Sequence, residues 1–387
     1  MRFLHSADWQ LGMTRHFLEG DSQPRYAAAR REAVTATAAL AEQIGAEFVV
    51  VAGDVFEYNQ LAPKVLSQSL EAMRAFTIPV YLLPGNHDPL DASSVYTGAQ
   101  FRAECPDNVI VVDRPVQVRP GVEIVAAPWR SKAPTTDLAA AALADLPADG
   151  TVRILLAHGG VDSLDPDAGK ASLIRMATVA EAIDRGALHY VALGDKHSRT
   201  EVGTTGRVWY SGSPEVTNFD DVEADSGHVL QVDLDMADPA HPVTVASHRV
   251  GRWRFVNLQR QVDNSRDIAD LDINLDQLSD KERTVVRLAL TGSLTVTDRA
   301  ALDGCVDKYS RLFASMYLRR RHSHLAVIPA DGEFDDLGIG GFAAAAVAEL
   351  VEAARAGDGA VGQDAQAAHD AQAALGLLLR LVEGSAA

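Results

Sequence analysis

Side chains of the kinds that hold metal ions lie just after five apolar runs in roughly the first 200 residues of the chain. A single aspartate in such a position means little, because Asp and Asn are common wherever a strand ends in a turn. Five run ends that each carry Asp, Asn or His instead predict one shared polar site. In chain order, the residues are Asp8, Asp54, Asn86, His87, Asp88, His158, Asp195 and His197.

These residue types indicate a particular chemistry. Carboxylate, amide and imidazole groups without a thiolate suit Mn²⁺, Mg²⁺, Fe²⁺ or Zn²⁺ in a site of nitrogen and oxygen ligands. A central aspartate, as Asp54 would be, can bridge two cations about 3.5 to 4 Å apart and so serve an in-line phosphoryl displacement. Adjacent glycines, Gly53, Gly85 and Gly194, permit sharp turns close to the metals. No P-loop or dinucleotide motif is present, so nucleotide-driven phosphoryl transfer is not expected.

The elements that must position these residues follow an alternating pattern from residue 1 to about 250, which is typical of a layered α/β domain. Because the carboxyl ends of strands in such sheets meet at one crevice, residues spread over about 190 positions can share a pocket. Strands at 229–234 and 243–248 follow one another without a helix, which predicts antiparallel pairing and a mixed sheet. The other expected strands are 3–4, 48–52, 80–83, 109–112, 122–126, 154–157, 190–193 and 208–210. The expected helices are 25–44, 63–76, 137–146 and 177–184.

A chain of 387 residues with 47% hydrophobic content is longer than a domain with a single hydrophobic core usually is, so further domains are expected. After residue 251, the pattern predicts a small α+β unit with strands at 253–258, 284–291 and 317–321 and helices at 265–271 and 298–313. From residue 331, the chain is rich in alanine and has ten acidic but only two basic residues. Helices are expected there at 342–355 and 363–383. The expected segments are 1–250, 251–330 and 331–387.

The net charge and the number of cysteines limit the classes of function that this chain can have. The formal net charge of −18 argues against broad attraction to nucleic acid or to anionic membranes. Two cysteines, Cys105 and Cys305, are too few for a disulfide framework and suggest reduced thiols in a cytoplasmic protein. No secretory signal is expected, and no apolar run approaches the roughly 18 residues that span a bilayer.

The ordered motifs resemble one known superfamily. They are Asp8-x-Gln10, Gly53-Asp54, Gly85-Asn86-His87-Asp88, His158 and Gly194-Asp195-x-His197. This series is similar to that of the calcineurin-like metallophosphoesterases. Within that superfamily, the segments at 4–12, 52–56 and 210–215 resemble the SbcD-type nuclease subunit of double-strand-break repair complexes.

The resemblance implies a four-layer α/β/β/α core with a small α+β cap and a helical tail. It also implies two bound divalent metal ions, with Mn²⁺ expected first. His87 would donate a proton to the leaving oxygen or stabilise its charge, and Asp88 would hold His87 in orientation. One metal would be held by Asp8, Gln10, Asp54 and His197. The other would be held by Asp54, Asn86, His158 and Asp195.

Two of these positions depart from the family pattern, which usually has histidine where this chain has Gln10 and Asp195. The amide oxygen of Gln10 would bind a metal more weakly than an imidazole, whereas Asp195 would add a negative charge. With Asp8 and Asp54 also ionised, three negative charges would face the four positive charges of two divalent ions. Both replacements keep a ligating atom, so we expect two metals to bind, with a preference for hard cations such as Mn²⁺ or Mg²⁺.

We therefore expect a metal-dependent phosphodiesterase. The resemblance implies a DNA exonuclease/endonuclease that acts in DNA repair. It also implies that residues 251–330 form a DNA-capping domain and that an SMC-like ATPase partner docks through the tail or the cap. A homodimer is also compatible with the sequence. One alternative is a phosphodiesterase or phosphatase for nucleotides or other small phosphoesters. The other is a non-catalytic subunit in which Gln10 and Asp195 have degraded the site.

A few residues outside the motifs are also candidates for DNA contacts. Arg319, Arg320 and Arg321 belong to the densest basic run and suit contacts with DNA phosphates, although a solvated strand edge explains the run equally well. Trp9 and Trp129 suit either stacking on a base or packing in a pocket wall.

Overall fold

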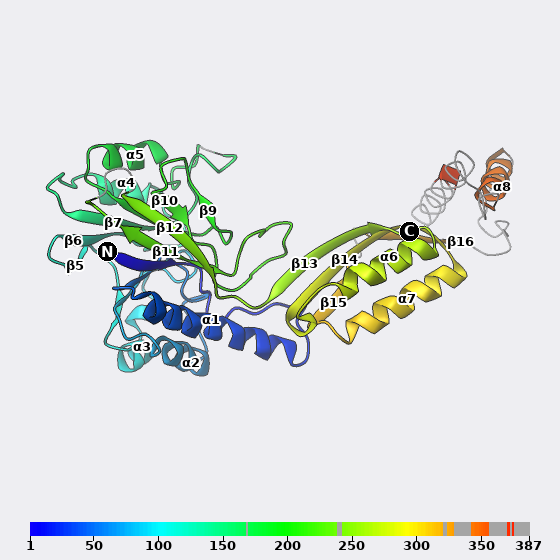
Figure 1. Ribbon diagram of the computed structural model, residues 1–387, viewed down its shortest axis with the longest axis horizontal. Helices are drawn as coiled ribbons and strands as arrows, with labels where there is room; N and C mark the ends of the chain where they lie inside the picture. The colour runs from blue at the N-terminus through cyan, green and yellow to red at the C-terminus, as the bar shows by residue number, and fades with distance from the viewer. Residues whose placement is uncertain are drawn as a thin grey trace. The chain divides into compact units, whose positions relative to one another are not determined.

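The computed structural model describes residues 1–167, 169–237, 242–319, 323–328, 342–355, 370, 371 and 374. The chain divides into two compact units, of which the first is Met1–Trp253 and the second begins at Arg254 (Figure 1). Apart from residues 370, 371 and 374, the helix expected at 363–383 lies outside the described residues, as do Arg320 and Arg321.

The first unit contains two six-stranded sheets. In the first sheet, β1 to β4 pair in parallel, and β11 pairs antiparallel with both β1 and β12. The predicted mixed sheet with an antiparallel end is therefore confirmed. In spatial order, the strands are β12 (Val243–Arg249), β11 (His228–Leu234), β1 (Arg2–Ser6), β2 (Val49–Val51), β3 (Val80–Leu82) and β4 (Val109–Val111).

The second sheet has a parallel centre and antiparallel edges. Strands β6, β7, β8 and β10 are parallel neighbours, whereas β5 and β9 each pair antiparallel with the strand beside them. Neither edge strand was expected from the sequence, because both are short and are not continuous apolar runs. In spatial order, the strands are β5 (Val116–Arg119), β6 (Val122–Ala127), β7 (Val152–His158), β8 (Tyr190–Gly194), β10 (Val208–Tyr210) and β9 (Thr200–Glu201).

Three apolar cores define the layers of this unit. Because successive strand residues point to opposite faces, Val49 and Val51 pack with the helices on the first sheet, while Val50 packs between the two sheets. The outer face of the second sheet packs against its own helices. The expected four-layer α/β/β/α core is therefore present (Figure 1). Its helices are α1 (Ser22–Ile44), α2 (Pro63–Met73), α3 (Ala99–Glu104), α4 (Leu138–Leu143) and α5 (Met176–Asp184).

The second unit is smaller, and its strands all pair in parallel. Helices α6 and α7 connect consecutive strands and pack on one face of the sheet, where they share a core with Leu258 and Leu288. The helix expected at 342–355 is present as α8, and β16 was not foreseen. The elements are β13 (Arg254–Gln261), α6 (Ser265–Asp276), β14 (Thr284–Thr295), α7 (Val296–Ser310), β15 (Ser315–Leu318), β16 (His324–Ile328) and α8 (Phe342–Arg355). Within the described ranges, no helix combines the length and apolar character needed to cross a bilayer.

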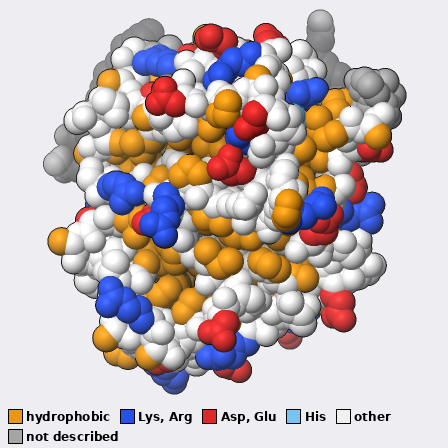
Figure 2. All heavy atoms as spheres, turned by 90° about the vertical axis from the view of Figure 1, so that its left-hand side faces the viewer, with side chains coloured by type: hydrophobic (Ala, Val, Ile, Leu, Met, Phe, Trp, Pro, Cys, Tyr) orange, Lys and Arg blue, Asp and Glu red, His pale blue; other side chains and the backbone are white. Residues whose placement is uncertain are grey.

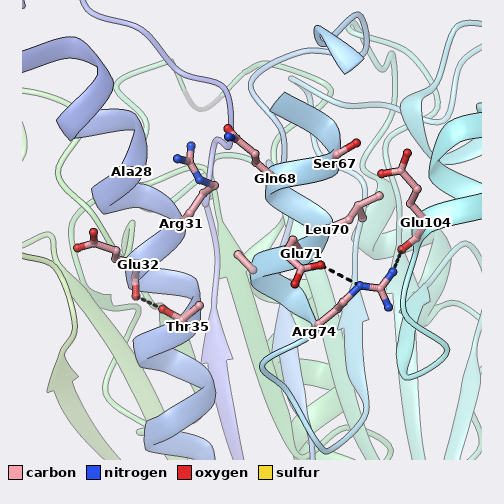
Figure 3. Close-up of a pocket in the computed structure, with 11 residues that line it drawn as sticks. Ala28, Arg31, Glu32, Thr35, Ser67, Gln68, Leu70, Glu71, Arg74 and Glu104 are labelled. Atoms are coloured by element: carbon pink, nitrogen blue, oxygen red, sulfur yellow. Dashed lines mark hydrogen bonds and ion pairs between the residues drawn. The ribbon is translucent and has the colours of Figure 1, made fainter. Parts of the chain in front are cut away.

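A groove with a volume of about 670 Å³ lies between α1 and α2 of the first unit (Figure 3). Arg74 crosses its rim, where its Nε lies 3.2 Å from Glu71 Oε2 and its Nη2 donates to the Glu104 carbonyl at 2.8 Å. None of the predicted metal ligands lines this groove. On the face seen in Figure 2, hydrophobic side chains gather near the middle among charges of both signs, so this face has no extended field of one sign.

Truncation of a side chain in the core between the two sheets should strongly destabilise the protein. Leu230→Ala should lower the free energy of unfolding by about 2–5 kcal/mol, because it empties a fully buried position between the sheets. Leu164→Ala is the matched control, since Leu164 is 47% exposed and its truncation should cost no more than about 0.5 kcal/mol. Urea denaturation followed by circular dichroism measures both values. Equal losses would contradict this account of the core.

Candidate metal centre

The predicted ligands lie at the carboxyl ends of parallel strands from both sheets. His158, the last residue of β7, is the centre of one group. Its Nε2 lies 2.7 Å from Asn86 Oδ1, 3.4 Å from Asp54 Oδ1 and 3.8 Å from Asp195 Oδ1. The structure thus places three of the other six predicted metal ligands around Nε2 of His158.

The other three ligands adjoin this group. His197 Nε2 lies 3.9 Å from Asp8 Oδ1 and 3.3 Å from Gln10 Nε2. The backbone N–H of Asp195 donates to both carboxylate oxygens of Asp8, at 3.1 and 3.2 Å, and so connects the two groups. Ligand atoms of Asp8, Asp54 and His158 lie within 4.8 Å of one another, a spacing compatible with a single metal ion.

The backbone at the predicted ligands is in an unusual conformation. Among the described residues, five other than glycine have a positive φ. Four of them are predicted ligands, namely Asp8, Gln10, Asp54 and Asp195, with φ of 54°, 42°, 53° and 98°. Such conformations cost roughly 1–3 kcal/mol each and persist where surrounding contacts enforce them. The chain therefore holds strain where the polar residues converge.

Two glycines allow these close approaches. A Cβ on Gly53, whose φ is +94°, would lie 2.2 Å from His158 Nδ1. A Cβ on Gly85 would lie 2.2 Å from Asp54 Oδ1. Any larger residue at either position would displace a predicted ligand, which explains why these glycines flank the motifs.

Burial and charge set the protonation of the cluster. Burial raises the pKa of Asp8 to about 7, with Asp54 and Asp195 adding to the rise, although His197 and His158 oppose it. Burial lowers the pKa of His158, but Asp54, Asp8 and Asp195 outweigh that effect and raise it well above its ordinary value. A protonated His158 Nε2 can donate to Asn86 Oδ1. In the absence of metal, protons therefore supply the positive charge that the carboxylates require.

The residues present fit the divalent metal ions that the motifs imply. The carboxyl groups of Asp8 and Asp54 are buried, and no thiol belongs to the cluster. Gln10 Oε1 is buried and has no hydrogen-bond donor within the described structure. A buried acceptor without a donor costs free energy, and a hard cation would satisfy it.

Hydrogen bonds behind the two histidines orient them toward the cluster. His158 Nδ1 donates to the Ala52 carbonyl at 2.9 Å. His197 Nδ1 lies 2.6 Å from Thr217 Oγ1, which in turn donates to the Glu223 carboxylate. Both arrangements leave Nε2 facing the site, as metal-binding histidines require. Thr217 and Glu223 were not foreseen, because nothing in the local pattern around residue 220 distinguishes one buried carboxylate from its exposed acidic neighbours.

The structure corrects the role expected for Asp88. Its carboxylate does not orient His87 but accepts hydrogen bonds from the Gly85 and Phe56 N–H groups at 2.8 and 3.0 Å and from the Tyr96 hydroxyl at 2.6 Å. His87 Nδ1 instead lies 2.9 Å from the Glu57 carbonyl. Asp88 therefore shapes the loop, and Glu57 orients the histidine. Because this contact uses the main-chain carbonyl of residue 57, which every residue type has, no side-chain pattern in the sequence points to it.

The two tryptophans named from the sequence differ in position. Trp9 is buried, donates to Ser6 Oγ at 2.8 Å and stacks on Phe76, so it is a core residue. Trp129 is half-buried beside the cluster, and its indole N–H donates to the His158 carbonyl at 2.7 Å. Arg319 lies in the second unit, directly after β15.

The raised pKa of Asp8 predicts a pH-dependent response to metal. Asp8 is mostly protonated below about pH 7, so a metal must displace its proton there, whereas above pH 7 the carboxylate is already ionised. Mn²⁺ affinity should therefore fall about tenfold per pH unit below 7 for each proton displaced. The rise in melting temperature caused by Mn²⁺, relative to EDTA, should be larger at pH 8 than at pH 6. Equal rises at both pH values would contradict this account.

Comparison with known proteins agrees with this arrangement. The family model described as calcineurin-like phosphoesterase matches residues 1–221. The DNA double-strand break repair protein Mre11 of Archaeoglobus fulgidus is 34% identical over 91 residues, which are 23% of this chain and 19% of that protein. The chain thus matches about a fifth of the length of this curated relative.

Two solved structures also align with the chain. TT1561 of Thermus thermophilus is 14% identical, with a TM-score of 0.41, and the alignment covers 64% of this chain and 98% of that one. A second structure is 14% identical with a TM-score of 0.38 over the same shares. Because the family model spans more than half of the sequence and its motif residues converge on one cluster, the protein belongs to the calcineurin-like phosphoesterases and is a metal-dependent hydrolase.

Proposed function

We propose that the protein is a DNA nuclease that uses two divalent metal ions, preferentially Mn²⁺, and acts in DNA repair. The observation that carries the proposal is the proximity of seven ligand-type side chains, among which Asp8, Asp54 and His158 have ligand atoms within 4.8 Å of one another. A ligand atom of Asp54 lies within 4.8 Å of ligand atoms of both Asp8 and His158, which supports its place in both proposed ligand sets. The proposed ligands of the first metal are Asp8, Gln10, Asp54 and His197. Those of the second are Asp54, Asn86, His158 and Asp195.

In this proposal, the chain's own residues have distinct tasks. The bound metals would supply Lewis acidity and a water of lowered pKa. In its doubly protonated form, His87 would donate its Nδ1–H to the Glu57 carbonyl and keep a second proton on Nε2, which lies 3.9 Å from Asp54 Oδ2. This Nε2 proton would pass to the leaving oxygen and leave a neutral imidazole. The backbone N–H of His87 donates to Asp54 Oδ1 at 3.0 Å and so holds the backbone of His87 beside the Asp54 carboxylate.

The second unit supports DNA as the substrate. Asn257, Arg287 and Tyr317 lie side by side on β13, β14 and β15, on the face opposite to α6 and α7. Arg287 Nε donates to Asn257 Oδ1 at 3.0 Å. Burial raises the pKa of Tyr317, and Arg287 and Arg319 oppose that rise, as expected of two guanidinium groups near one phenol. An aromatic ring flanked by arginines suits stacking on a base next to phosphates.

The charge of these strands favours the same substrate. None of the three strands β13, β14 and β15 contains Asp or Glu, although the chain as a whole has a net charge of −18. The proposal therefore assigns residues 251–330 the role of a DNA-capping domain. It also includes Arg319, Arg320 and Arg321 as proposed contacts for DNA phosphates. The tail, residues 331–387, is proposed as the segment that binds an SMC-like ATPase, and co-purification from the native cell tests that assignment.

Catalysis is tested with Mn²⁺-loaded protein on linear DNA and on bis-p-nitrophenyl phosphate. Asp54→Asn should abolish both activities, because Asp54 belongs to both proposed ligand sets. His87→Gln should lower kcat by about 10²- to 10⁴-fold and leave Mn²⁺ affinity near that of the wild type. His16→Gln, at an exposed histidine, is the matched control and should change neither.

The same assays separate the alternatives. Hydrolysis of the small diester without cleavage of DNA would favour a small phosphoester as the substrate. Mn²⁺ binding without either activity would indicate a non-catalytic subunit and overturn the proposal.

DNA binding by the second unit is tested by fluorescence anisotropy with single-stranded DNA. Arg287→Gln and Arg319→Gln should each weaken binding and reduce the slope of affinity against salt by about one. Arg266→Gln is the matched control, because Arg266 is exposed on α6, away from this face. Hydrolysis of the small diester should be unchanged in all three variants. Equal losses in the control would show that the effect comes from net charge alone.

A further inference from the structure

Arg30 is a buried cation in the middle of α1, next to the turn formed by residues 8–10. Only 1% of its surface is exposed. A buried guanidinium must have its N–H groups satisfied by acceptors, because its desolvation otherwise costs several kcal/mol. Its acceptors therefore show what the residue does in the fold.

One side of the guanidinium binds all three carbonyl groups of the turn. Nη2 donates to the Trp9 carbonyl at 2.7 Å and to the Asp8 carbonyl at 3.3 Å. Nε donates to the carbonyls of Trp9 at 3.0 Å and of Gln10 at 3.2 Å. Three carbonyl oxygens that point to one place repel one another, and the positive charge of Arg30 offsets that repulsion.

The other side of the guanidinium binds the loop that follows β10. Nη1 donates to the Val216 carbonyl at 3.2 Å, to the Glu215 carbonyl at 3.3 Å and to the Tyr26 hydroxyl at 2.9 Å. The Glu215 carboxylate is engaged elsewhere, since it accepts from the backbone N–H groups of Val216, Arg252 and Trp253. Arg30 thus ties the turn to a second loop that is itself fixed within the first unit.

The turn needs such a restraint because of its backbone conformation. Asp8 and Gln10 both have a positive φ, which side chains with a Cβ rarely adopt. This conformation places the three carbonyls toward Arg30 and brings the Asp8 carboxylate and the Gln10 amide to His197. The contacts of Arg30 with the carbonyls and the position of the two side chains are consequences of one backbone shape.

We infer that Arg30 is the positioning residue of the metal centre, which holds residues 8–10 in the metal-ligating conformation before any metal binds. The inference rests on the proposed function, because it takes Asp8 and Gln10 as ligands. It adds that the strained turn is organised by a cation of the chain itself rather than by the metal. Without Arg30, metal binding would have to supply the free energy that orders the turn.

The test compares Arg30→Lys with Arg31→Lys in the full-length chain. Arg31 is the next residue, is half-buried, and donates to the Ala27 carbonyl of its own helix. Lysine keeps the charge in both variants but offers one nitrogen in place of the guanidinium fork. Arg30→Lys should weaken Mn²⁺ affinity by about tenfold or more in isothermal titration calorimetry, and Arg31→Lys should not.

A second readout needs no metal. The amides of Gln10 and Leu11 donate to the carbonyls of Asp54 and Val55, so a loosened turn would expose them to exchange in metal-free protein. Hydrogen exchange of residues 7–12 should be faster in Arg30→Lys, and that of the second sheet should be unchanged. Saturating Mn²⁺ should restore most of the hydrolysis of bis-p-nitrophenyl phosphate.

Each outcome has a definite meaning. The inference would be overturned if Arg30→Lys kept both the Mn²⁺ affinity and the hydrogen exchange of the wild type at residues 7–12. It would also be overturned by faster exchange throughout the first unit, because that result would indicate a purely structural role for Arg30. If Arg30→Lys does not fold, Tyr26→Phe replaces it, because it removes one acceptor of Nη1 and should produce a smaller change of the same kind. Failure of the wild-type protein to bind Mn²⁺ would instead refute the proposed metal centre.

Discussion

The repulsion among three carboxylates in a confined space is the constraint on which the rest of this structure depends. Asp8 and Asp54 are buried, Asp195 reaches the same cluster, and burial, reinforced by Asp54 and Asp195 and opposed by His197 and His158, raises the pKa of Asp8 to about 7. Such a cluster is stable only if protons, protonated histidines or metal ions supply positive charge. The imidazoles oriented by backbone and hydroxyl partners, the tight glycines and the left-handed backbone at the ligands all serve to hold these groups together.

The layered fold is what makes this arrangement possible. Asp8 and Asp54 follow strands of the first sheet, whereas His158 ends a strand of the second. The core between the sheets therefore sets the separation of the ligands. The α1 helix contributes from outside the sheets, since Arg30 crosses to the carbonyls of residues 8–10. A catalytic cluster assembled from separate layers depends on packing as much as on its own residues.

The net charge of −18 has a different meaning once these charges are located. The tail from residue 331 has ten acidic and two basic residues, and three more acidic residues belong to the cluster that metal ions would neutralise. The strands β13, β14 and β15 carry no acidic residue. The overall acidity is thus compatible with a local surface for a polyanion, because screened electrostatics act over about 8–10 Å rather than over the whole molecule.

The sequence by itself was sufficient to predict the residue types of the site, the alternation of strands and helices, and the mixed first sheet. These features depend on apolar runs and turn residues, which can be recognised within short segments of the chain. Tertiary structure alone decided the partners. Glu57 rather than Asp88 orients His87, Thr217 and Glu223 support His197, and Arg30 holds residues 8–10. Some of these partners lie within one loop and others lie far apart in the chain. Strand order and packing bring such groups to hydrogen-bond distance, and no local pattern of residues encodes which of several candidate groups will arrive there.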